Sequence, residues 1–280
     1  MEFAYYEPCA PLQKFVSSYY FVSLPFDLAE IMRAEIANVR FILSGEVISD
    51  LHGQEEAFHH GSAVLCGPTN RWSRIKFAKG AKIFGAAITP LGWCKLFGSS
   101  AEGAADRFMP LRDKVPATVQ PLIDNVFHAP DDAGVVRAAD ALFLSLISDK
   151  WRIREDFIEQ VTNWIVDPEP NEIDHLLNNV DLSHRQVDRL CKAYFGAPPK
   201  RLHRKFRALH AANRLAWMEL TDWREVARAA YYDQAHFIRE FKEFNGRTPQ
   251  EFIDGPHLLV RMTLAERRKI NHGSPFSLVG

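Results

Sequence analysis

The sequence lacks the features that mark secreted and membrane proteins. Its four cysteines, Cys9, Cys66, Cys94 and Cys191, lie far apart and form no C-x-x-C pair, so they indicate reduced thiols used mainly in packing. The chain does not open with a basic segment followed by an apolar one. No apolar run approaches the ~18 residues that a membrane span requires. We therefore expect a cytoplasmic protein that makes no contact with a membrane.

The sequence also has few signs of catalysis. It contains no G-x-S-x-G motif and no glycine-rich phosphate loop. His52, His59 and His60 are the one group that suggests a metal, but the adjacent His59 and His60 would point to opposite faces of a strand, and residues 53–56 read as a hairpin turn. We predict no catalytic site, no metal and no cofactor, and we keep a cupin-like metal enzyme only as the less favoured alternative.

Charge is balanced over the whole chain but not along it. The 280 residues carry a formal net charge of −1, and 25% of them are charged. A chain of this length has room for about two domains, each with its own core. Overall neutrality argues against a protein that coats nucleic acid without sequence preference. Any strongly basic segment must be offset by acidic residues elsewhere.

Residues 1–110 have the composition and spacing of a β-rich domain. They contain short β-branched and aromatic runs separated by Gly, Pro and Asn, which is typical of a β-sandwich or small barrel. The predicted strands are 15–22, 39–43, 46–48, 63–66, 73–77 and 82–88. Trp72 and Trp93, with Arg40, Arg71 and Arg74, are candidates to line an effector pocket in this domain, although aromatic residues at such spacing more often belong to a core.

The chain after Pro90 reads as helical. We expect helical segments at 91–98 and 101–108, at least two helices in 111–146, and an amphipathic helix at 152–166. The Pro-bounded acidic break at 167–170 is a predicted hinge. The predicted fold class is α+β. The predicted divisions are 1–110 as a β-rich sensor or dimerisation domain, 111–166 as a helical connector, 167–254 as a DNA-binding domain, and 255–280 as a tail with a last helix at 258–270 and frayed residues at 271–280.

Two similarly built segments, 183–196 and 233–246, carry the strongest signal in the sequence. Ser183 and Asp233 can cap a helix, and Gly196 and Gly246 can end one. Each segment follows a shorter amphipathic stretch, 172–179 in the first case and 223–230 in the second. A short helix, a tight turn and a capped second helix form a helix-turn-helix motif, whose second helix enters the DNA major groove.

A third helix is expected to join the two motifs. Residues 199–220 have one apolar side, and a helix of ~22 residues is ~33 Å long, close to the ~34 Å repeat of B-DNA. Residues 183–218 contain nine Lys and Arg residues against a single acidic residue, Asp188. Since phosphates attract such a surface through counterion release, we expect two recognition helices on one face of the DNA.

These segments resemble the AraC/XylS family of transcriptional regulators. The resemblance lies in residues 182–190, 195–202 and 231–241, closing with 246–249. A weaker similarity, at 88–93 and 105–107, links the N-terminal part to one branch of the same family, in which a β-rich sensor precedes a helical connector. The resemblance implies a sequence-specific regulator whose partners are double-stranded DNA, the transcription machinery, a possible small-molecule effector and a possible second copy of the chain.

The resemblance also implies contact residues, and side-chain chemistry supports most of them. Arg can bridge guanine O6 and N7, Gln can bridge adenine N6 and N7, and Ala can contact only a thymine methyl. The implied base-reading residues are Arg185, Asp188, Arg189, Gln234, Ala235, His236 and Arg239. The implied phosphate contacts are Lys192, Lys200, Arg201, Arg204 and Lys205.

The sequence departs from the family pattern in the turns between the paired helices. Where the pattern has Gly, this chain has Asp181 in the first motif and Ala230 in the second. Asp accepts a left-handed conformation better than Ala does. A protein-interaction module with weakened DNA binding is therefore the second functional hypothesis.

Overall fold

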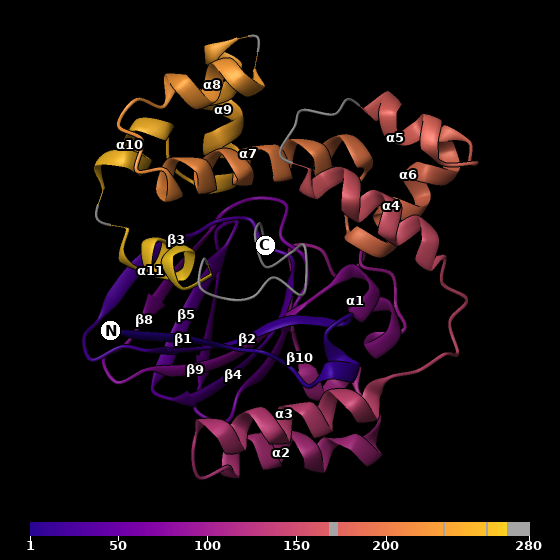
Figure 1. Ribbon diagram of the computed structural model, residues 1–280. Coiled ribbons are helices and arrows are strands. Elements are labelled where there is room, and N and C mark those ends of the chain that lie inside the picture. The colour runs from indigo at the N-terminus through magenta and orange to yellow at the C-terminus, as the bar shows by residue number, and fades with distance from the viewer. Residues whose placement is uncertain (168–172, 232, 256, 268–280) are drawn as a thin grey trace.

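The computed structural model describes residues 1–280 apart from 168–172, 232, 256 and 268–280. Two β-sheets form the body of the molecule, one pair of helices lies beneath them, and a layer of helices lies on the opposite side (Figure 1). The predicted hinge at 168–170 and the predicted frayed end at 271–280 lie outside the described residues. In the part of the chain that is described, no helix is long and apolar enough to cross a membrane.

The strands form two antiparallel sheets, one of six strands in the order β1-β2-β9-β4-β7-β10 and one of four in the order β3-β8-β5-β6. The strands are β1 (Glu2–Tyr6), β2 (Val16–Ser23), β3 (Leu28–Met32), β4 (Ala37–Ser44), β5 (Glu46–Leu51), β6 (Gln54–His59), β7 (Ala63–Cys66), β8 (Ser73–Phe77), β9 (Lys82–Ile88) and β10 (Phe108–Pro110). All six predicted strands are present. The turn predicted at 53–56 lies earlier, at His52 and Gly53, both with positive φ, so that β6 begins at Gln54.

The six-stranded sheet is covered on both faces, which explains its almost continuous apolar strands. Along β2, Tyr19 and Phe21 pack into the core that the sheet shares with neighbouring helices. Tyr20 and Val22 alternate with them and face the four-stranded sheet. The space between the two sheets is therefore lined by one face of each.

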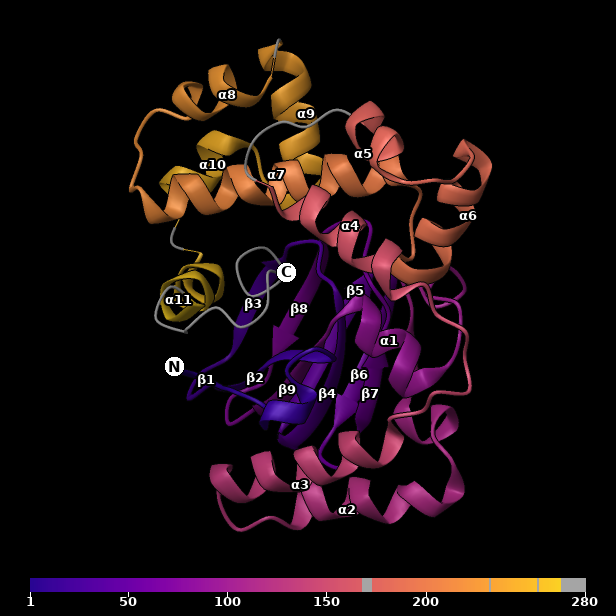
Figure 2. The same cartoon turned by 45° about the vertical axis from the view of Figure 1, so that its right-hand side comes forward.

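Helices surround this sandwich (Figures 1 and 2). They are α1 (Pro90–Phe97), α2 (Gln120–His128), α3 (Asp132–Leu146), α4 (Glu155–Val166), α5 (Ile173–Asn179), α6 (His184–Phe195), α7 (Pro199–Trp217), α8 (Arg224–Ala230), α9 (Gln234–Asn245), α10 (Pro249–Asp254) and α11 (Leu258–Arg267). The α+β fold class is confirmed. The helix predicted at 101–108 is wrong, because Asp106 adopts a positive φ and binds the Asn70 backbone N–H while Phe108 pairs with Cys66 in β10.

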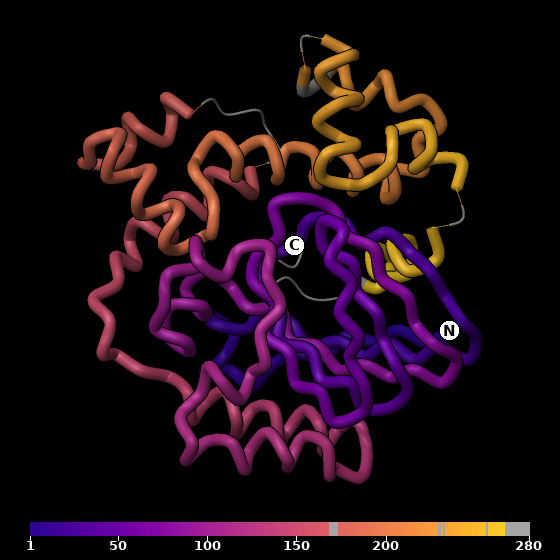
Figure 3. The backbone as a smooth tube through the Cα atoms, turned by 180° about the vertical axis from the view of Figure 1, so that it is seen from behind, coloured from indigo at the N-terminus to yellow at the C-terminus, as the bar shows by residue number. Residues whose placement is uncertain are grey.

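The helical layer is organised along α7. α5 and α6 lie towards one end of α7, and α8, α9 and α10 lie towards the other (Figure 2). α4, expected in a connector, packs with the first group, since Phe157, Val161 and Trp164 share a core with Val187 and Phe206. Seen from behind, α2 and α3 form the tier on the far side of the sheets from this layer (Figure 3).

Gly92 allows α1 to approach the chain before β2. A Cβ added there would lie 1.9 Å from the backbone oxygen of Phe15. Gly92→Ala should therefore lower the free energy of unfolding by ~1–3 kcal/mol, in spite of the better helix propensity of Ala. Gly103→Ala is the matched control, since nothing lies within 4 Å of its added Cβ. Equal urea denaturation curves for the two variants would contradict the close packing of α1.

Candidate nucleic-acid interface

The first recognition helix, α6, starts and stops where its sequence requires. The Ser183 hydroxyl accepts the Gln186 backbone N–H, and the Gln186 side chain accepts the Ser183 N–H at 2.9 Å, which forms a capping box. The spacing of Ser183 and Gln186 is readable from the sequence, although the prediction used Ser183 alone. Gly196 ends the helix with φ +77. The expected bounds of α6 are confirmed.

The second recognition helix, α9, repeats this arrangement. The Asp233 carboxylate accepts the backbone N–H groups of Ala235 and His236, at 3.0 and 3.2 Å. Gly246 ends the helix with φ +76. Both helices therefore begin with a capped, positively polarised end, to which a negatively charged partner is attracted.

The unusual turn residues do not distort the motifs. Neither Asp181 nor Ala230 is among the described residues with positive φ. The first turn closes through a hydrogen bond from the Leu182 N–H to the Val180 oxygen at 2.9 Å. The second turn leaves α8 through Tyr231, whose backbone is extended. A left-handed turn residue is therefore not needed in either motif.

The residues predicted to read bases lie on the outer sides of α6 and α9. Most of them are exposed, and Asp188 is half-buried and bound to Lys192 at 2.9 Å. His236 also has a partner, since its Nε2 lies 3.3 Å from Glu240. The exposed members are Arg185, Arg189, Gln234, Ala235, His236 and Arg239.

The residues predicted to bind phosphate are not equally available. Lys200 is exposed and Lys192 is half-buried. Lys205 is only 2% exposed, and its ammonium donates to the backbone oxygen of Glu35 at 2.6 Å. Arg201 and Arg204 bind carboxylates on α9. The prediction that Lys205 contacts phosphate does not fit this arrangement, because the buried ammonium lies between the helical layer and the β-sandwich.

A buried carboxylate holds α7 and α9 together. Glu240 of α9 has no exposed surface. Its two oxygens bind Arg204 at 2.9 Å, Arg207 at 2.7 Å and the Tyr231 hydroxyl at 2.7 Å. Glu243, one turn further along, binds Arg201 at 2.6 Å. Sequence spacing does not predict these ion pairs, because the acidic residues that neutralise α7 lie more than 30 residues later in the chain.

Family comparison agrees with this geometry. Residues 176–255 match the family model of a helix-turn-helix domain. The chain carries an AraC-type helix-turn-helix domain. It is a DNA-binding transcriptional regulator, as its sequence predicted. No curated protein matches the sequence.

Solved structures give more distant likenesses to this AraC-type chain. ToxT from Vibrio cholerae O395 is 11% identical over 83% of this chain and 95% of its own, with a TM-score of 0.47. The AraC-like transcriptional activator CuxR is 13% identical over 90% of each chain, with a TM-score of 0.26. Likenesses at these TM-scores do not identify the function of this regulator. Its helix-turn-helix assignment comes from residues 176–255.

The N-terminal half of this regulator contacts the C-terminal ends of both recognition helices. The Ala101 N–H donates to the Ala193 oxygen of α6, and the Ala34 N–H donates to the Phe244 oxygen of α9, each at 2.8 Å. Both contacts satisfy carbonyls that a helix end leaves without an intrahelical partner. The segment after α1 and the segment after β3 therefore hold α6 and α9 through equivalent hydrogen bonds.

The glycines that end these helices explain the close approach. A Cβ on Gly196 would lie 2.6 Å from Pro68, and a Cβ on Gly246 would lie 2.4 Å from Ile31 and 2.9 Å from Trp72. Trp72 was a candidate to line an effector pocket, and instead it packs against the end of α9. Each glycine thus supplies both a left-handed backbone and the space for the sandwich.

A cavity of about 50 Å³ lies between the two sheets. Its polar end is Arg40, which donates to the Tyr20 hydroxyl at 3.0 Å and to Glu35 at 2.5 Å. Burial raises the pKa of Tyr20 to about 12, so its hydroxyl stays protonated and donates to Asn38 at 3.2 Å. Gly85 lies opposite both Tyr20 and Arg40 in the sheet, and a Cβ there would lie 2.0 Å from the Tyr20 ring.

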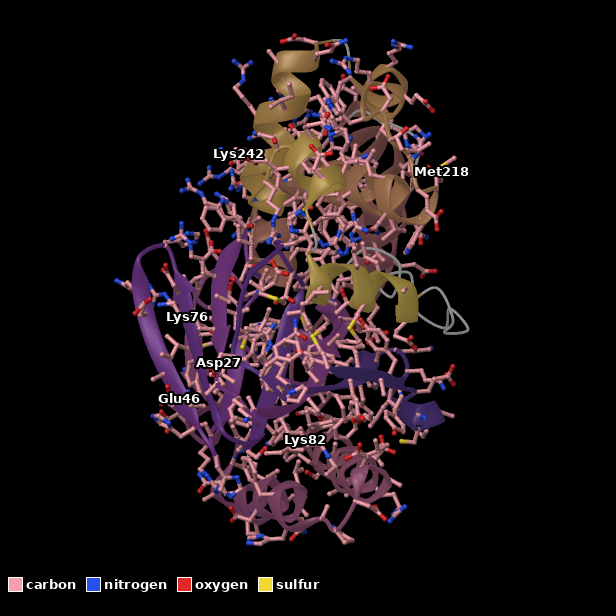
Figure 4. All side chains as sticks on the ribbon, turned by 90° about the vertical axis from the view of Figure 1, so that its left-hand side faces the viewer. Asp27, Glu46, Lys76, Lys82, Met218 and Lys242 are labelled. Carbon is pink, nitrogen blue, oxygen red and sulfur yellow. The ribbon has the colours of Figure 1, made fainter. Side chains whose placement is uncertain are left out.

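α11 closes one side of this cavity with Leu259 and Thr263. The same helix reaches the DNA-binding domain, where Val260 and Leu264 join the core of α7 and α9. Figure 4 shows α11 between the helical layer and the strands, with the labelled Lys242 and Met218 on opposite sides of that layer. Residues beyond the helix-turn-helix domain thus take part in both halves of the molecule.

The other residues considered for an effector or metal site lie elsewhere. Trp93 is buried in the core beneath the six-stranded sheet, and Arg71 and Arg74 are exposed. Of the predicted pocket candidates, Arg40 lines the cavity.

The three histidines do not converge. His52 faces Asp106 at 3.4 Å, His59 faces Glu46 at 3.2 Å, and His60 faces a backbone oxygen at 2.7 Å. Within the described ranges, no group of three His, Cys, Asp or Glu side chains is placed to hold a metal ion.

Removing the buried carboxylate should loosen α9. Glu240→Ala leaves Arg204 and Arg207 without their shared acceptor, and breaking a buried ion pair from one side costs ~3–5 kcal/mol. Glu225→Ala removes an exposed carboxylate from α8 and should change the free energy of unfolding by less than about 0.5 kcal/mol. Chemical denaturation measures both. Similar losses in the two variants would show that Glu240 does not join α7 to α9.

Lys205 should make stability depend on pH. Burial lowers its pKa from 10.5 to about 8 in the folded protein. Between pH 8 and 10.5 the unfolded chain therefore binds more protons at this residue, so its contribution to the free energy of unfolding rises with pH. The advantage of wild type over Lys205→Met should grow between pH 7.5 and 9.5 in urea denaturation. A difference that does not change with pH would contradict the burial of this ammonium.

Proposed function

We propose that this regulator reads bases with both α6 and α9, which enter successive turns of the major groove on one face of the DNA. The observation that carries the proposal is the pair of capped helices whose outer sides present Arg185, Arg189, Gln234 and Arg239. Arg pairs with guanine and Gln with adenine through two hydrogen bonds, each worth ~1–3 kcal/mol of discrimination.

The length of α7 suits this spacing. Its 19 residues span ~28 Å at 1.5 Å per residue, shorter than the ~33 Å expected from sequence. The recognition helices belong to units at its two ends, so their outer sides can lie further apart than the helix is long. A separation near the ~34 Å DNA repeat is therefore within reach.

The phosphate contacts in this proposal begin with Lys200, which is exposed at the first turn of α7, and Lys192 in the last turn of α6. Arg201 and Arg204 contribute less to this set, because each is bound to a carboxylate of α9. Lys205 is left out of the set.

We further propose that the cavity between the sheets is the effector site. It has apolar walls and a small polar end at Arg40, Tyr20 and Asn38, the arrangement typical of small-molecule sites. Pairing of two copies and contact with the transcription machinery are parts of the same proposal and rest on the family resemblance. A cytoplasmic location follows from the DNA partner.

The packing suggests a domain division that differs from the expected one. We place the sensor at residues 1–146, since α1, α2 and α3 share a core with the six-stranded sheet. The DNA-binding domain then begins with α4, which packs into the first helix-turn-helix unit, and α11 connects the two.

Selection from a random double-stranded DNA pool with the full-length protein tests the proposed reading of DNA. The enriched sequences should contain two short blocks about one helical turn apart. An absence of enrichment, both from the full chain and from residues 150–280, would reject it.

Binding of two variants to the selected operator then distinguishes base contacts from phosphate contacts. Arg189→Ala should relax the preference at one base position and cost ~1–3 kcal/mol on the operator. Lys200→Ala should weaken binding to all sequences alike and reduce the slope of affinity against salt concentration by ~1. Titrations at several salt concentrations measure both. Variants that bind and discriminate like wild type would show that these residues are not the contacts.

A further inference from the structure

Glu240, which joins α9 to α7, also lies beside one of the residues predicted to read bases. His236 and Glu240 are four residues apart in α9, so their side chains lie on the same side of the helix. The His236 Nε2 lies 3.3 Å from a Glu240 oxygen. The rings of His236 and Tyr231 are nearly perpendicular, with centroids 5.9 Å apart. The imidazole is therefore held at its inner edge.

The carboxylate beside this imidazole is fixed in place. Glu240 has no exposed surface. Its Oε1 binds Arg207 and the Tyr231 hydroxyl, each at 2.7 Å. Its Oε2 binds Arg204 at 2.9 Å and is the oxygen that faces His236. Because both oxygens are bound, an acceptor always lies next to Nε2.

This acceptor decides where the imidazole carries its proton. A neutral imidazole has one N–H donor, and its other ring nitrogen accepts a hydrogen bond. A carboxylate oxygen at 3.3 Å attracts a proton on Nε2 and repels a lone pair there. The acceptor is then Nδ1, which points away from Glu240. Since 47% of the His236 side chain is exposed and none of Glu240, this outer edge is the one that DNA can reach.

An acceptor at this place discriminates among bases. His236 is the third residue of α9, next to the end that Asp233 caps. In the major groove, cytosine N4 and adenine N6 donate hydrogen bonds, whereas guanine presents only the acceptors O6 and N7. A lone pair on Nδ1 therefore pairs with cytosine or adenine and is repelled by guanine.

We propose that Glu240 is a positioning residue for base recognition: it fixes the His236 proton on Nε2, and Nδ1 accepts a hydrogen bond from the amino group of a cytosine or an adenine. The same carboxylate thus holds α9 on α7 and sets the base that α9 selects. This inference rests on the proposed reading of DNA, to which it adds the chemical class of base that His236 takes.

The proton can be located without DNA. Long-range nitrogen–proton correlation spectra of the full-length protein, at about pH 8 where a free imidazole is neutral, show which ring nitrogen of each histidine is protonated. The signals of His236 are those missing from His236→Ala. Wild type should carry the proton on Nε2, and a proton on Nδ1 would overturn the proposal.

Glu240→Gln exchanges the acceptor beside the imidazole for a donor. The oxygen of the introduced amide can still accept from Arg207 and Tyr231, and its NH2 group then faces Nε2 of His236. The imidazole proton should therefore move to Nδ1, which becomes a donor. A donor at this place pairs with the O6 or N7 of guanine and is repelled by the amino group of cytosine.

Glu243→Gln is the matched control. Glu243 also joins α9 to α7, but its carboxylate binds Arg201 and Arg204. Both variants thus lose one carboxylate between the two helices, and only Glu240→Gln changes the group beside His236. In Glu240→Gln, Arg204 keeps its bond to Glu243.

Binding to DNA supplies the second measurement. Operators selected from random DNA with wild type and with His236→Ala identify the base position that His236 reads, as the one whose preference the variant relaxes. Titrations then compare operators with cytosine or guanine at this position. Wild type and Glu243→Gln should favour cytosine about fivefold, the value of about one hydrogen bond. Glu240→Gln should favour guanine.

Several results would overturn the proposal. They are an unchanged preference for cytosine in Glu240→Gln, an equal loss of affinity of that variant for both operators, and a preference for guanine in wild type. The spectra and the preference of wild type remain decisive if Glu240→Gln does not fold. A lack of any enriched operator for wild type would reject the proposed reading of DNA, whereas an operator whose preferences His236→Ala leaves unchanged would reject this inference alone.

Discussion

The structure depends on one helix, α7, that has to fit three surfaces at once. Its apolar side contributes Leu202 and Phe206 to the first helix-turn-helix unit and Ala212 and Leu215 to the second. Among its charged side chains, Arg204 binds a carboxylate of α9, Lys205 binds the β-sandwich, and Lys200 is exposed. Because α7 contacts both helix-turn-helix units and the β-sandwich, the two recognition helices are held relative to each other and to the sensor. A basic helix that looks in sequence like a phosphate-binding surface is thus in large part an internal scaffold.

Local signals predicted most of the elements, and contacts between distant residues decided the rest. Ser183, Asp233, Gly196 and Gly246 fixed the ends of both recognition helices, because capping and left-handed termination depend on neighbouring residues. The partner of Arg204 could not be predicted, since Glu240 lies 36 residues later. Periodicity places such a residue on a face of a helix but does not show what covers that face. Most of the outer residues of α6 and α9 are exposed, so their place on the helix surface follows from local periodicity alone.

The sensor and the DNA-binding domain also contact each other directly, at two places. Residues 30–36 contact both the cavity and the end of α9, and α11 contacts both the cavity and the core that joins α7 to α9. In both places one short element contacts both halves of the molecule. The effector control proposed above needs only a difference in affinity between docked and undocked arrangements.

The most direct test of the account is a hydroxyl-radical footprint of the full-length protein on its selected operator. Two recognition helices held at the ends of α7 predict two protected blocks on one face of the DNA, centred about one helical turn apart. A single protected block, or two blocks on opposite faces, would contradict the central claim that α6 and α9 read DNA together.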